Sequence, residues 1–359
     1  MNVNNLNCQL EEFAELRHNA FVSVLELGSE GKHVAGIYGV NVPREILWAM
    51  DIVPINVFGI DGSNIEAAEK IMSKKSCSLL KASYGYIITD KCPFSHFAHI
   101  MVGTDYCGKK ESMIYKLKKI KGAKKIYIIR EHKNAYTQVS EYKNFIHFLQ
   151  REFDTEFDKN KLAAVIKKTN AVGLLIQGIT DIYMRHPRIM NGYDLVSIIY
   201  GSQFIFDLDR RIERLSQLRE TLNIMLPESD TSFKRVLMTG VPLAGFREEI
   251  LKPLSSLNYA ILTLSGCEGE NYKVANEEGD LFYNLSQKYE AENFCEKLSH
   301  IVSKYHIDGV INIKIKGCSL QYEDCSHLEI PHLSVTVDYN CDNYDKVLVH
   351  IKSFINNIQ

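Results

Sequence analysis

Cysteines are the residues of this sequence whose type and placement could do chemistry. The chain has nine of them, and Cys77, Cys92 and Cys107 are equally spaced along "CSLLKASYGYIITDKCPFSHFAHIMVGTDYCGKK". Cys267 and Cys318 each follow an apolar run and a glycine, in "AILTLSGC" and "VINIKIKGC". Thiols in such places can be metal or cluster ligands, nucleophiles or packing residues.

The spacing alone leaves these alternatives open. Structural zinc sites usually show close cysteine pairs, and the closest pair here is Cys318 and Cys325. Buried free cysteine is common in protein cores. Iron–sulfur clusters accept widely spaced thiolates when several loops converge, and glycine beside a cysteine lets backbone N–H groups approach the sulfides. A catalytic Cys–His pair remains an alternative, because four histidines lie near thiols in the sequence: His96, His99, His132 and His327.

The composition is that of a globular protein without a nucleic-acid surface. The chain has 359 residues, which suggests two domains, and its net charge of −2 argues against a basic binding face. The N-terminus does not read as a signal peptide, and no apolar run approaches the length of a membrane span. We therefore expect a cytoplasmic protein with no membrane contact, in which thiols stay reduced.

The predicted order of helices and strands indicates where the cysteines lie in the fold. Residues 1–33 predict a helical segment, and residues 34–135 predict strands alternating with helices, as in a parallel sheet. Residues 136–230 predict a helical connecting region. Its clearest apolar stripe consists of Phe204, Leu208, Ile212, Leu215, Leu218 and Leu222. Residues 231–359 predict a second α/β lobe. Two such lobes form an α/β fold with parallel sheets.

Cys107, Cys267 and Cys318 each fall just past the carboxyl end of a predicted strand. That edge of an open parallel sheet is where ligands bind. Two lobes whose strand edges face each other would therefore gather these cysteines in one cleft.

The segment containing Cys77, Cys92 and Cys107 resembles the 2-hydroxyacyl-CoA dehydratase D-component family, and most of all its double-cubane cluster branch. That branch shows "C-P-L-I-K-S-S-Y-G", "K-C-P" and "V-G-E-T-T-C-D-G-K-K-K-M-Y-E" in this order. Further similar pieces are "YGSQFIFD", "GCEGE", "DGVINIKIKGC" and "HLSVTVDYN". The resemblance extends from about Gly36 to the end of the chain.

The resemblance implies two Rossmann-like lobes, iron–sulfur clusters in the cleft and a dimer, homodimeric or heterodimeric. It implies an ATP-hydrolysing iron–sulfur activator as partner, which delivers single low-potential electrons. Dehydratase members remove water from 2-hydroxyacyl-CoA, whereas the double-cubane branch carries two cubanes joined by a sulfide and reduces small molecules. A member that has lost its cluster and binds a ligand or partner remains a third alternative.

The resemblance also assigns ligands residue by residue. Cys77, Cys107 and Cys318 match the ligands of one [4Fe-4S] cubane, and Cys92 and Cys267 match ligands of the second cubane of an 8Fe-9S double cubane. The sequence departs from that branch where Val241 replaces a cysteine of "TGCP" and where "TTCDGKKK" has become "TDYCGKKE". Cys341 lies outside every matching motif, and we expect it to be a packing residue.

Some residues around the motifs have two interpretations. Glu45, in "VPREIL", matches the family's "P-E-E-L" helix start near the substrate and is the candidate catalytic residue; it could equally complement the dipole of its helix. Lys109 and Lys110 either offset the charge of thiolates, cluster or CoA phosphates or are solvated at the surface. Tyr38 and Ser83 are expected to line the cleft from loops.

Overall fold

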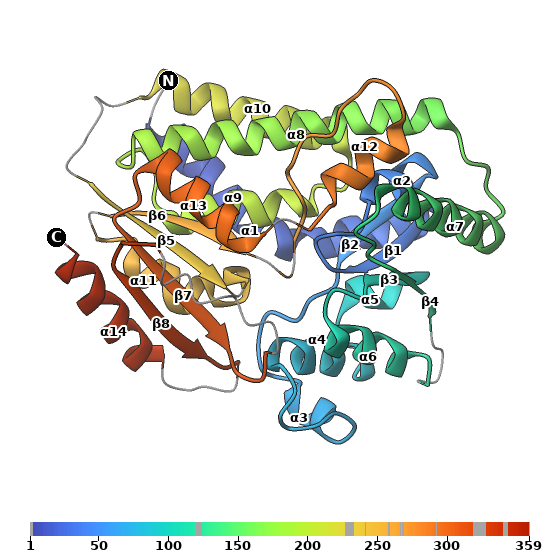
Figure 1. Ribbon diagram of the computed structural model, residues 1–359, viewed down its shortest axis with the longest axis horizontal. Helices are drawn as coiled ribbons and strands as arrows, with labels where there is room; N and C mark the ends of the chain where they lie inside the picture. The colour runs from blue at the N-terminus through green and yellow to red at the C-terminus, as the bar shows by residue number, and fades with distance from the viewer. Residues whose placement is uncertain are drawn as a thin grey trace.

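The computed structural model of the chain contains two four-stranded parallel sheets, one in each half of the sequence (Figure 1). It describes residues 3–119, 124–226, 233–240, 242–257, 259–265, 267, 269–291, 293–318, 328–339 and 344–358. The α/β fold with two Rossmann-like lobes and parallel sheets is therefore confirmed.

The first sheet has the strand order β2-β1-β3-β4. Its strands are β1 (His33–Tyr38), β2 (Ile52–Asn56), β3 (Ile100–Thr104) and β4 (Lys125–Ile129). Every residue of the central strand β3 is buried, as expected for a parallel strand covered on both faces. The order reverses between β1 and β3, so a ligand would bind beyond the carboxyl ends of these two strands.

The second sheet repeats this topology with the order β6-β5-β7-β8. Its strands are β5 (Lys234–Gly240), β6 (Tyr259–Ser265), β7 (Gly309–Ile315) and β8 (His332–Val337). Here the order reverses between β5 and β7. Cys107 follows β3 and Cys318 follows β7, so each lobe places a cysteine beside its own reversal point.

Helices cover the first sheet and connect its strands. They are α2 (Arg44–Ala49), α3 (Ile65–Glu69), α4 (Ser78–Ile88), α5 (Pro93–Phe97), α6 (Gly108–Leu117) and α7 (Ala135–Phe153). Pro43 is the residue immediately before α2, where its missing N–H costs no helix hydrogen bond.

The two sheets are bridged by long helices that run along one side of both (Figure 1). These are α8 (Lys159–Arg185), α9 (Gly192–Gly201) and α10 (Leu208–Ile224), and α1 (Val3–Ser29) packs against α9 and against α5 of the first lobe. Oxygen-bearing side chains begin the long helices, since Asn134 caps α7, Asp158 caps α8 and Asp207 caps α10.

The helices of the second half are α11 (Lys252–Leu254), α12 (Leu281–Lys288), α13 (Phe294–Tyr305) and α14 (Tyr344–Asn357). The segment "FREEILKPLSSL" forms a π-helical turn, Arg247–Leu251, that runs into the short α11. α12 leaves the second sheet and packs against α7 of the first lobe, so the chain crosses between the lobes more than once.

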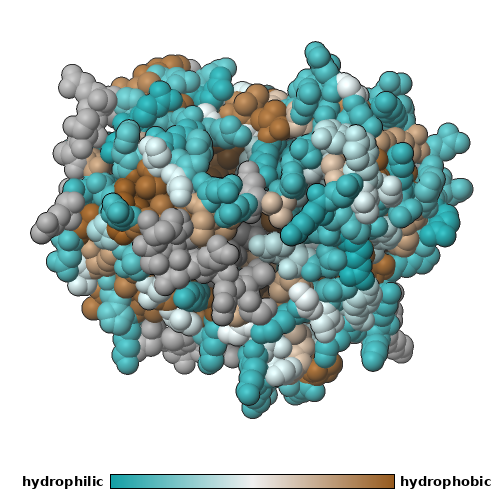
Figure 2. Space-filling view, viewed as in Figure 1, coloured by the Kyte–Doolittle hydropathy of each residue, from teal (hydrophilic) through white to brown (hydrophobic). Residues whose placement is uncertain are grey.

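One helix of the described part of the chain, α8, is long and apolar enough to cross a membrane by length and composition. In the structure its buried side chains, among them Ile166, Ile176 and Ile179, face the interior, and α8 packs against α10 and α2. Over the described residues, the face in Figure 2 is mostly hydrophilic, with hydrophobic residues in separate small patches. α8 is therefore a core helix of this fold.

Candidate functional site

Three of the predicted ligands occupy the same structural position. Cys77, Cys92 and Cys107 are the N-cap residues of α4, α5 and α6. Cysteine is not among the residues that favour this position, which the long helices of this protein fill with Asn or Asp. Local helix stability therefore does not explain three cysteines in a row at helix starts. An N-terminal helix end does favour a thiolate, because its free N–H groups and dipole stabilise negative charge.

The two lobes meet where α4 and α6 begin. The backbone N–H of Ser78 donates to the carbonyl of Lys316 at 3.1 Å, and the ammonium of Lys109 donates to the carbonyl of Gly317 at 2.9 Å. Gly317 has a φ of +78°, and a Cβ at this residue would lie 2.4 Å from the carbonyl oxygen of Ser76. Only glycine allows this approach, which brings the turn after β7 against the start of α4.

Cysteines from both lobes interact at this junction. The thiols of Cys77 and Cys318 are hydrogen-bonded, and this bond together with burial raises the pKa of Cys77, with Cys267 close enough to add to the effect. The pKa of Tyr106 is raised by burial, by Glu131, and by the neighbouring Cys267, Cys107 and Cys318. Cys107, Cys267 and Cys318 therefore lie near Tyr106, and Cys267 and Cys318 also lie near Cys77.

A buried lysine accompanies these cysteines. Lys110 has 3% of its surface exposed, and its ammonium donates to the carbonyl of Cys267 at 3.0 Å and lies 5.8 Å from the centre of the Phe58 ring. Neither partner is a carboxylate. Lys110 is thus not a solvated surface residue, whereas the exposed Lys109 contacts the second lobe through Gly317. Both cations bind backbone carbonyls at or next to the candidate ligands Cys267 and Cys318.

Cys92 lies within the first lobe, at the start of α5. Its sulfur accepts a hydrogen bond from the N–H of Ser95 at 3.4 Å, and 6% of its surface is exposed. Burial, and to a lesser degree Cys92, raises the pKa of Tyr38, whose buried hydroxyl has no hydrogen-bond partner among the described residues. The expected loop positions are wrong for both Tyr38, the last residue of β1, and Ser83, which lies inside α4. The hydroxyl of Ser83 accepts from the N–H of Gly59 and donates to the carbonyl of Leu79.

The assignment of particular ligands stays a prediction. Among the residues that the structure describes, no three His, Cys, Asp or Glu side chains are grouped closely enough to hold a metal ion. Four residues with expectations lie outside the described residues, namely Val241, Cys325, His327 and Cys341. The expectations for them stay predictions.

The residues nevertheless fit an iron–sulfur group in their chemistry. Thiols are the ligands such clusters use, and the Cys77–Cys318 hydrogen bond joins one thiol from each lobe. Helix starts at Cys77 and Cys107 and the buried cation of Lys110 supply positive potential where thiolates and a cluster would carry negative charge.

Glu45 lies in a separate buried network. Its carboxylate accepts hydrogen bonds from Lys288 Nζ at 2.7 Å, Tyr289 Oη at 2.8 Å and Thr169 Oγ1 at 3.0 Å. Burial by itself would raise the pKa of Glu45, but the charge and hydrogen bond of Lys288 outweigh it, so the pKa is lowered. Glu45 does stand in the first turn of α2, and its main partners join α2 to α8 and α12. A catalytic role for it stays a prediction.

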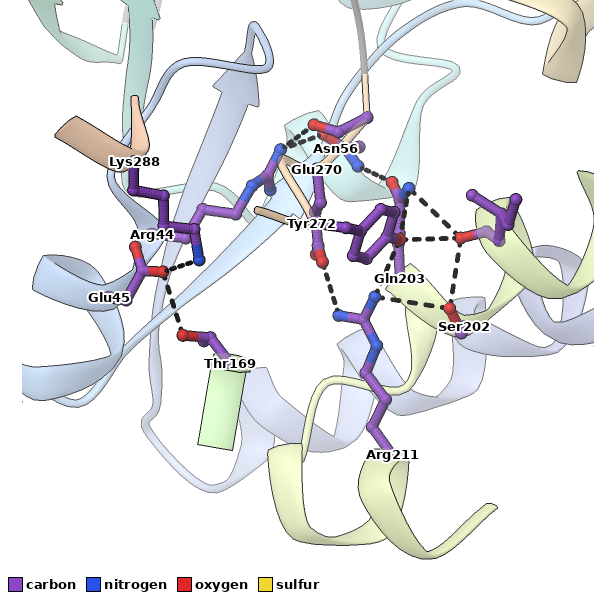
Figure 3. A network of polar contacts seen from close by, with 12 residues as sticks. Arg44, Glu45, Asn56, Thr169, Ser202, Gln203, Arg211, Glu270, Tyr272 and Lys288 are labelled. Atoms are coloured by element: carbon purple, nitrogen blue, oxygen red, sulfur yellow. Dashed lines mark hydrogen bonds and ion pairs between the residues drawn. The ribbon is translucent and has the colours of Figure 1, made fainter. Parts of the chain in front are cut away.

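The network continues through residues that the sequence did not single out (Figure 3). Arg44 Nη2 donates to Asn56 Oδ1 at 2.8 Å and to the carbonyl of Gly269 at 2.6 Å. Asn56 donates to Gln203, whose amide contacts the hydroxyl of Tyr272 at 3.1 Å.

Arg211 completes the network from α10. It pairs with Glu270 at 2.8 Å and donates to the hydroxyl of Tyr272 at 3.1 Å. Burial raises the pKa of Tyr272 to about 12, against the opposing effect of Arg211. The sequence offered one signal for this network, namely that Arg44 stands where the family motif has an acidic residue.

Comparison with known proteins agrees with the resemblance read from the motifs. Residues 39–358 match the family model described as 2-hydroxyglutaryl-CoA dehydratase, D-component. The chain is also similar to YjiM of Escherichia coli (strain K12), which is named as a dehydratase subunit; the two are 23% identical over 377 aligned positions that cover 98% of each chain. Since the family model covers most of the sequence, this chain belongs to the 2-hydroxyglutaryl-CoA dehydratase D-component family.

Proposed function

We propose that this chain is an iron–sulfur protein that accepts low-potential electrons from an ATP-dependent activator and reduces a small substrate at a cubane or double-cubane cluster. The observation that carries the proposal is the contact between Cys77 and Cys318, thiols from opposite lobes, at a junction that also gathers Cys107 and Cys267.

The residues would divide the work as follows. Cys77, Cys107 and Cys318 would hold the first cluster, and Cys92 and Cys267 would take part in a second. When bound, such a cluster accepts and passes on single electrons at low potential. Lys110 and the N-termini of α4 and α6 would lower the cost of keeping the thiols deprotonated.

The junction between the lobes would keep the ligands in register. The Ser78–Lys316 and Lys109–Gly317 hydrogen bonds hold the turn after β7 against α4 and α6. A protein whose lobes remain closed in this way limits the access of water and oxygen to the region between them.

A second candidate is a single-cubane 2-hydroxyacyl-CoA dehydratase subunit, a lyase acting on an acyl-CoA. The description of the matched family favours it, as does Val241, which replaces a cysteine of the double-cubane branch. For either candidate we propose a dimer, most simply a homodimer, in the cytoplasm. Light scattering that shows a monomer at micromolar concentration would contradict the proposed assembly.

The test is reduction by the activator. Anaerobically purified protein is mixed with an ATP-hydrolysing activator of this family, a low-potential reductant and MgATP, and the visible absorbance of the chain's cluster is followed. We expect bleaching that requires both ATP and activator. Cys318→Ala should lack both the absorbance and its bleaching.

Cys8→Ala is the matched control, because Cys8 is exposed on α1. It should behave as the wild type. Bleaching without ATP would contradict the role of the activator, and a colourless wild-type protein would favour the cluster-free alternative. Addition of 2-hydroxyacyl-CoA distinguishes the two candidates, since a dehydratase forms the enoyl-CoA and a small-molecule reductase does not.

A further inference from the structure

A small pocket lies beside the buried network of Figure 3, between α2, α8, α10 and the segment 270–272. Arg44, Trp48, Arg211 and Tyr272 contribute to its wall, and its free volume for a water-sized sphere is about 10 Å³. A cavity needs roughly 10–15 Å³ to hold one water molecule. The pocket therefore has room for a small ion or for one end of a larger ligand.

Among the described residues, the charges around this pocket do not balance. Lys288 is paired with Glu45, and Arg211 is paired with Glu270. Arg44 has 2% of its surface exposed and forms no ion pair within the described part of the chain; its hydrogen bonds go to a neutral amide and a carbonyl. A buried cation without a counter-charge is costly, so a site of this kind favours an anion.

Unused hydrogen-bond donors line the same pocket. Nε and Nη1 of Arg44, Nε of Arg211 and Nε1 of Trp48 are buried and have no hydrogen-bond partner among the residues that the structure describes. Buried polar groups are nearly always paired, and the four named here are all donors. Trp48 is four residues after Arg44 in α2, so both side chains lie on the same side of that helix.

We propose that this pocket binds a small monoanion, such as a carboxylate, on Arg44 and Trp48. The anion would supply the missing negative charge and accept from the unpartnered N–H groups. One charge fits better than two, because among the described residues the carboxylates of Glu45 and Glu270 leave a single guanidinium uncompensated. The anion is either a free ion or the carboxylate of a larger ligand.

The inference concerns the pocket alone and does not depend on a cluster. The segment that contributes Gly269, Glu270 and Tyr272 to the network begins two residues after Cys267 in the sequence. A ligand held at Arg44 would thus be anchored close in sequence to one of the cysteines of the lobe junction.

The test uses the full chain and the fluorescence of Trp48, which is its single tryptophan. Formate is titrated as the probe, formamide serves as a neutral molecule of the same shape, and chloride represents inorganic monoanions. We expect a saturable fluorescence change with formate and none with formamide. In Arg44→Gln the dissociation constant should rise about tenfold or more, as for the loss of a charged hydrogen bond.

Arg210→Gln is the matched control, because Arg210 is an exposed arginine of α10. It should bind formate like the wild type. Melting temperatures provide a second measurement: formate should raise that of the wild type and raise that of Trp48→Phe less, since ligand binding stabilises the folded state. This readout still tests the site if Arg44→Gln does not fold.

Several results would overturn the proposal: no response to formate, an equal response to formamide, or an equal loss of response in Arg210→Gln. A response to chloride at least as strong as that to formate supports the monoanion site and identifies the free ion as the ligand. A stronger response to formate supports the carboxylate. None of these outcomes depends on iron content, so they are independent of the proposed redox function.

Discussion

At the scale of single residues, buried charges divide into paired and unpaired ones. The Glu45–Lys288 pair joins positions 243 residues apart in the sequence, and both side chains are almost fully buried. Tyr289 and Thr169 also donate hydrogen bonds to the carboxylate. A pair of this kind contributes less through its own attraction than through the cost of breaking it.

Removing the lysine tests this view. In Lys288→Met the carboxylate of Glu45 is left buried without its cation, and we expect the free energy of unfolding to fall by about 3–5 kcal/mol. The double variant Glu45→Gln/Lys288→Met should lose less, since no buried charge remains. Urea unfolding measures both.

Lys161→Met is the surface control, because the Lys161–Asp51 pair leaves 53% and 70% of its side chains exposed. It should change stability by about 0–1 kcal/mol. Equal losses of unfolding free energy in Lys288→Met and Lys161→Met would mean that the buried Glu45–Lys288 pair matters no more to stability than a surface pair.

Acid should weaken the same pair. The folded-state pKa of Glu45 lies below the ordinary value of 4.5, so its contribution to stability is fully present above that value and is lost as the pH falls through the folded-state pKa. Between pH 6 and strongly acidic pH, wild-type stability should therefore fall more steeply than that of Glu45→Gln. Parallel pH profiles for the two proteins would contradict this.

The residue scale also shows what the sequence could predict. Cys77, Cys107, Cys267 and Cys318 were found because strand ends and family motifs can be read locally. Arg44 and its partner Gly269 are 225 residues apart, so no local pattern indicates that they meet. Charge balance in a core depends on such distant contacts and is not visible before the fold is known.

At the scale of elements, the starts of α4 and α6 are features that the sequence did not predict. The strands that end just before Cys107, Cys267 and Cys318 were predicted, because short apolar runs bounded by turn residues mark them. The starts of α4 and α6 at Cys77 and Cys107 were not, because cysteine is a poor N-cap and carries no start signal. Likewise, nothing local marked Arg247–Leu251 as a π-helical turn.

The turn after β7 gives a testable case at this scale. Gly317→Ala introduces a Cβ that would meet the carbonyl oxygen of Ser76, and it also strains a φ of +78°. The backbone strain alone costs about 1–2 kcal/mol, and displacement of packed atoms adds about 1–3 kcal/mol. We expect lower stability by denaturant unfolding and less iron per chain.

Gly279→Ala separates these two costs. Gly279 has a φ of +82°, and a Cβ there would meet no atom within 4 Å. This variant should lose only the stability that the backbone strain accounts for and should keep its iron. Equal losses in both variants would mean that the contact between Gly317 and α4 does not hold the lobes together.

At the scale of the whole molecule, the two lobes have the same topology and meet beside their points of strand reversal. The alternation of strands and helices was sufficient to predict two parallel sheets, because parallel strands need helical crossovers. How the lobes face each other could not be read from that alternation. It depends on backbone contacts such as Ser78–Lys316 and on α8 and α12, which pack across both halves.

The central claim is that thiols from both lobes hold an iron–sulfur cluster. Iron and sulfide analysis of anaerobically purified protein tests it most directly. The account predicts about four irons per chain for a single cubane or about eight for a double cubane, retained in Cys8→Ala and lost in both Cys107→Ala and Cys318→Ala. A wild-type chain without iron, or one that keeps its full iron content when Cys107 and Cys318 are replaced, would contradict it.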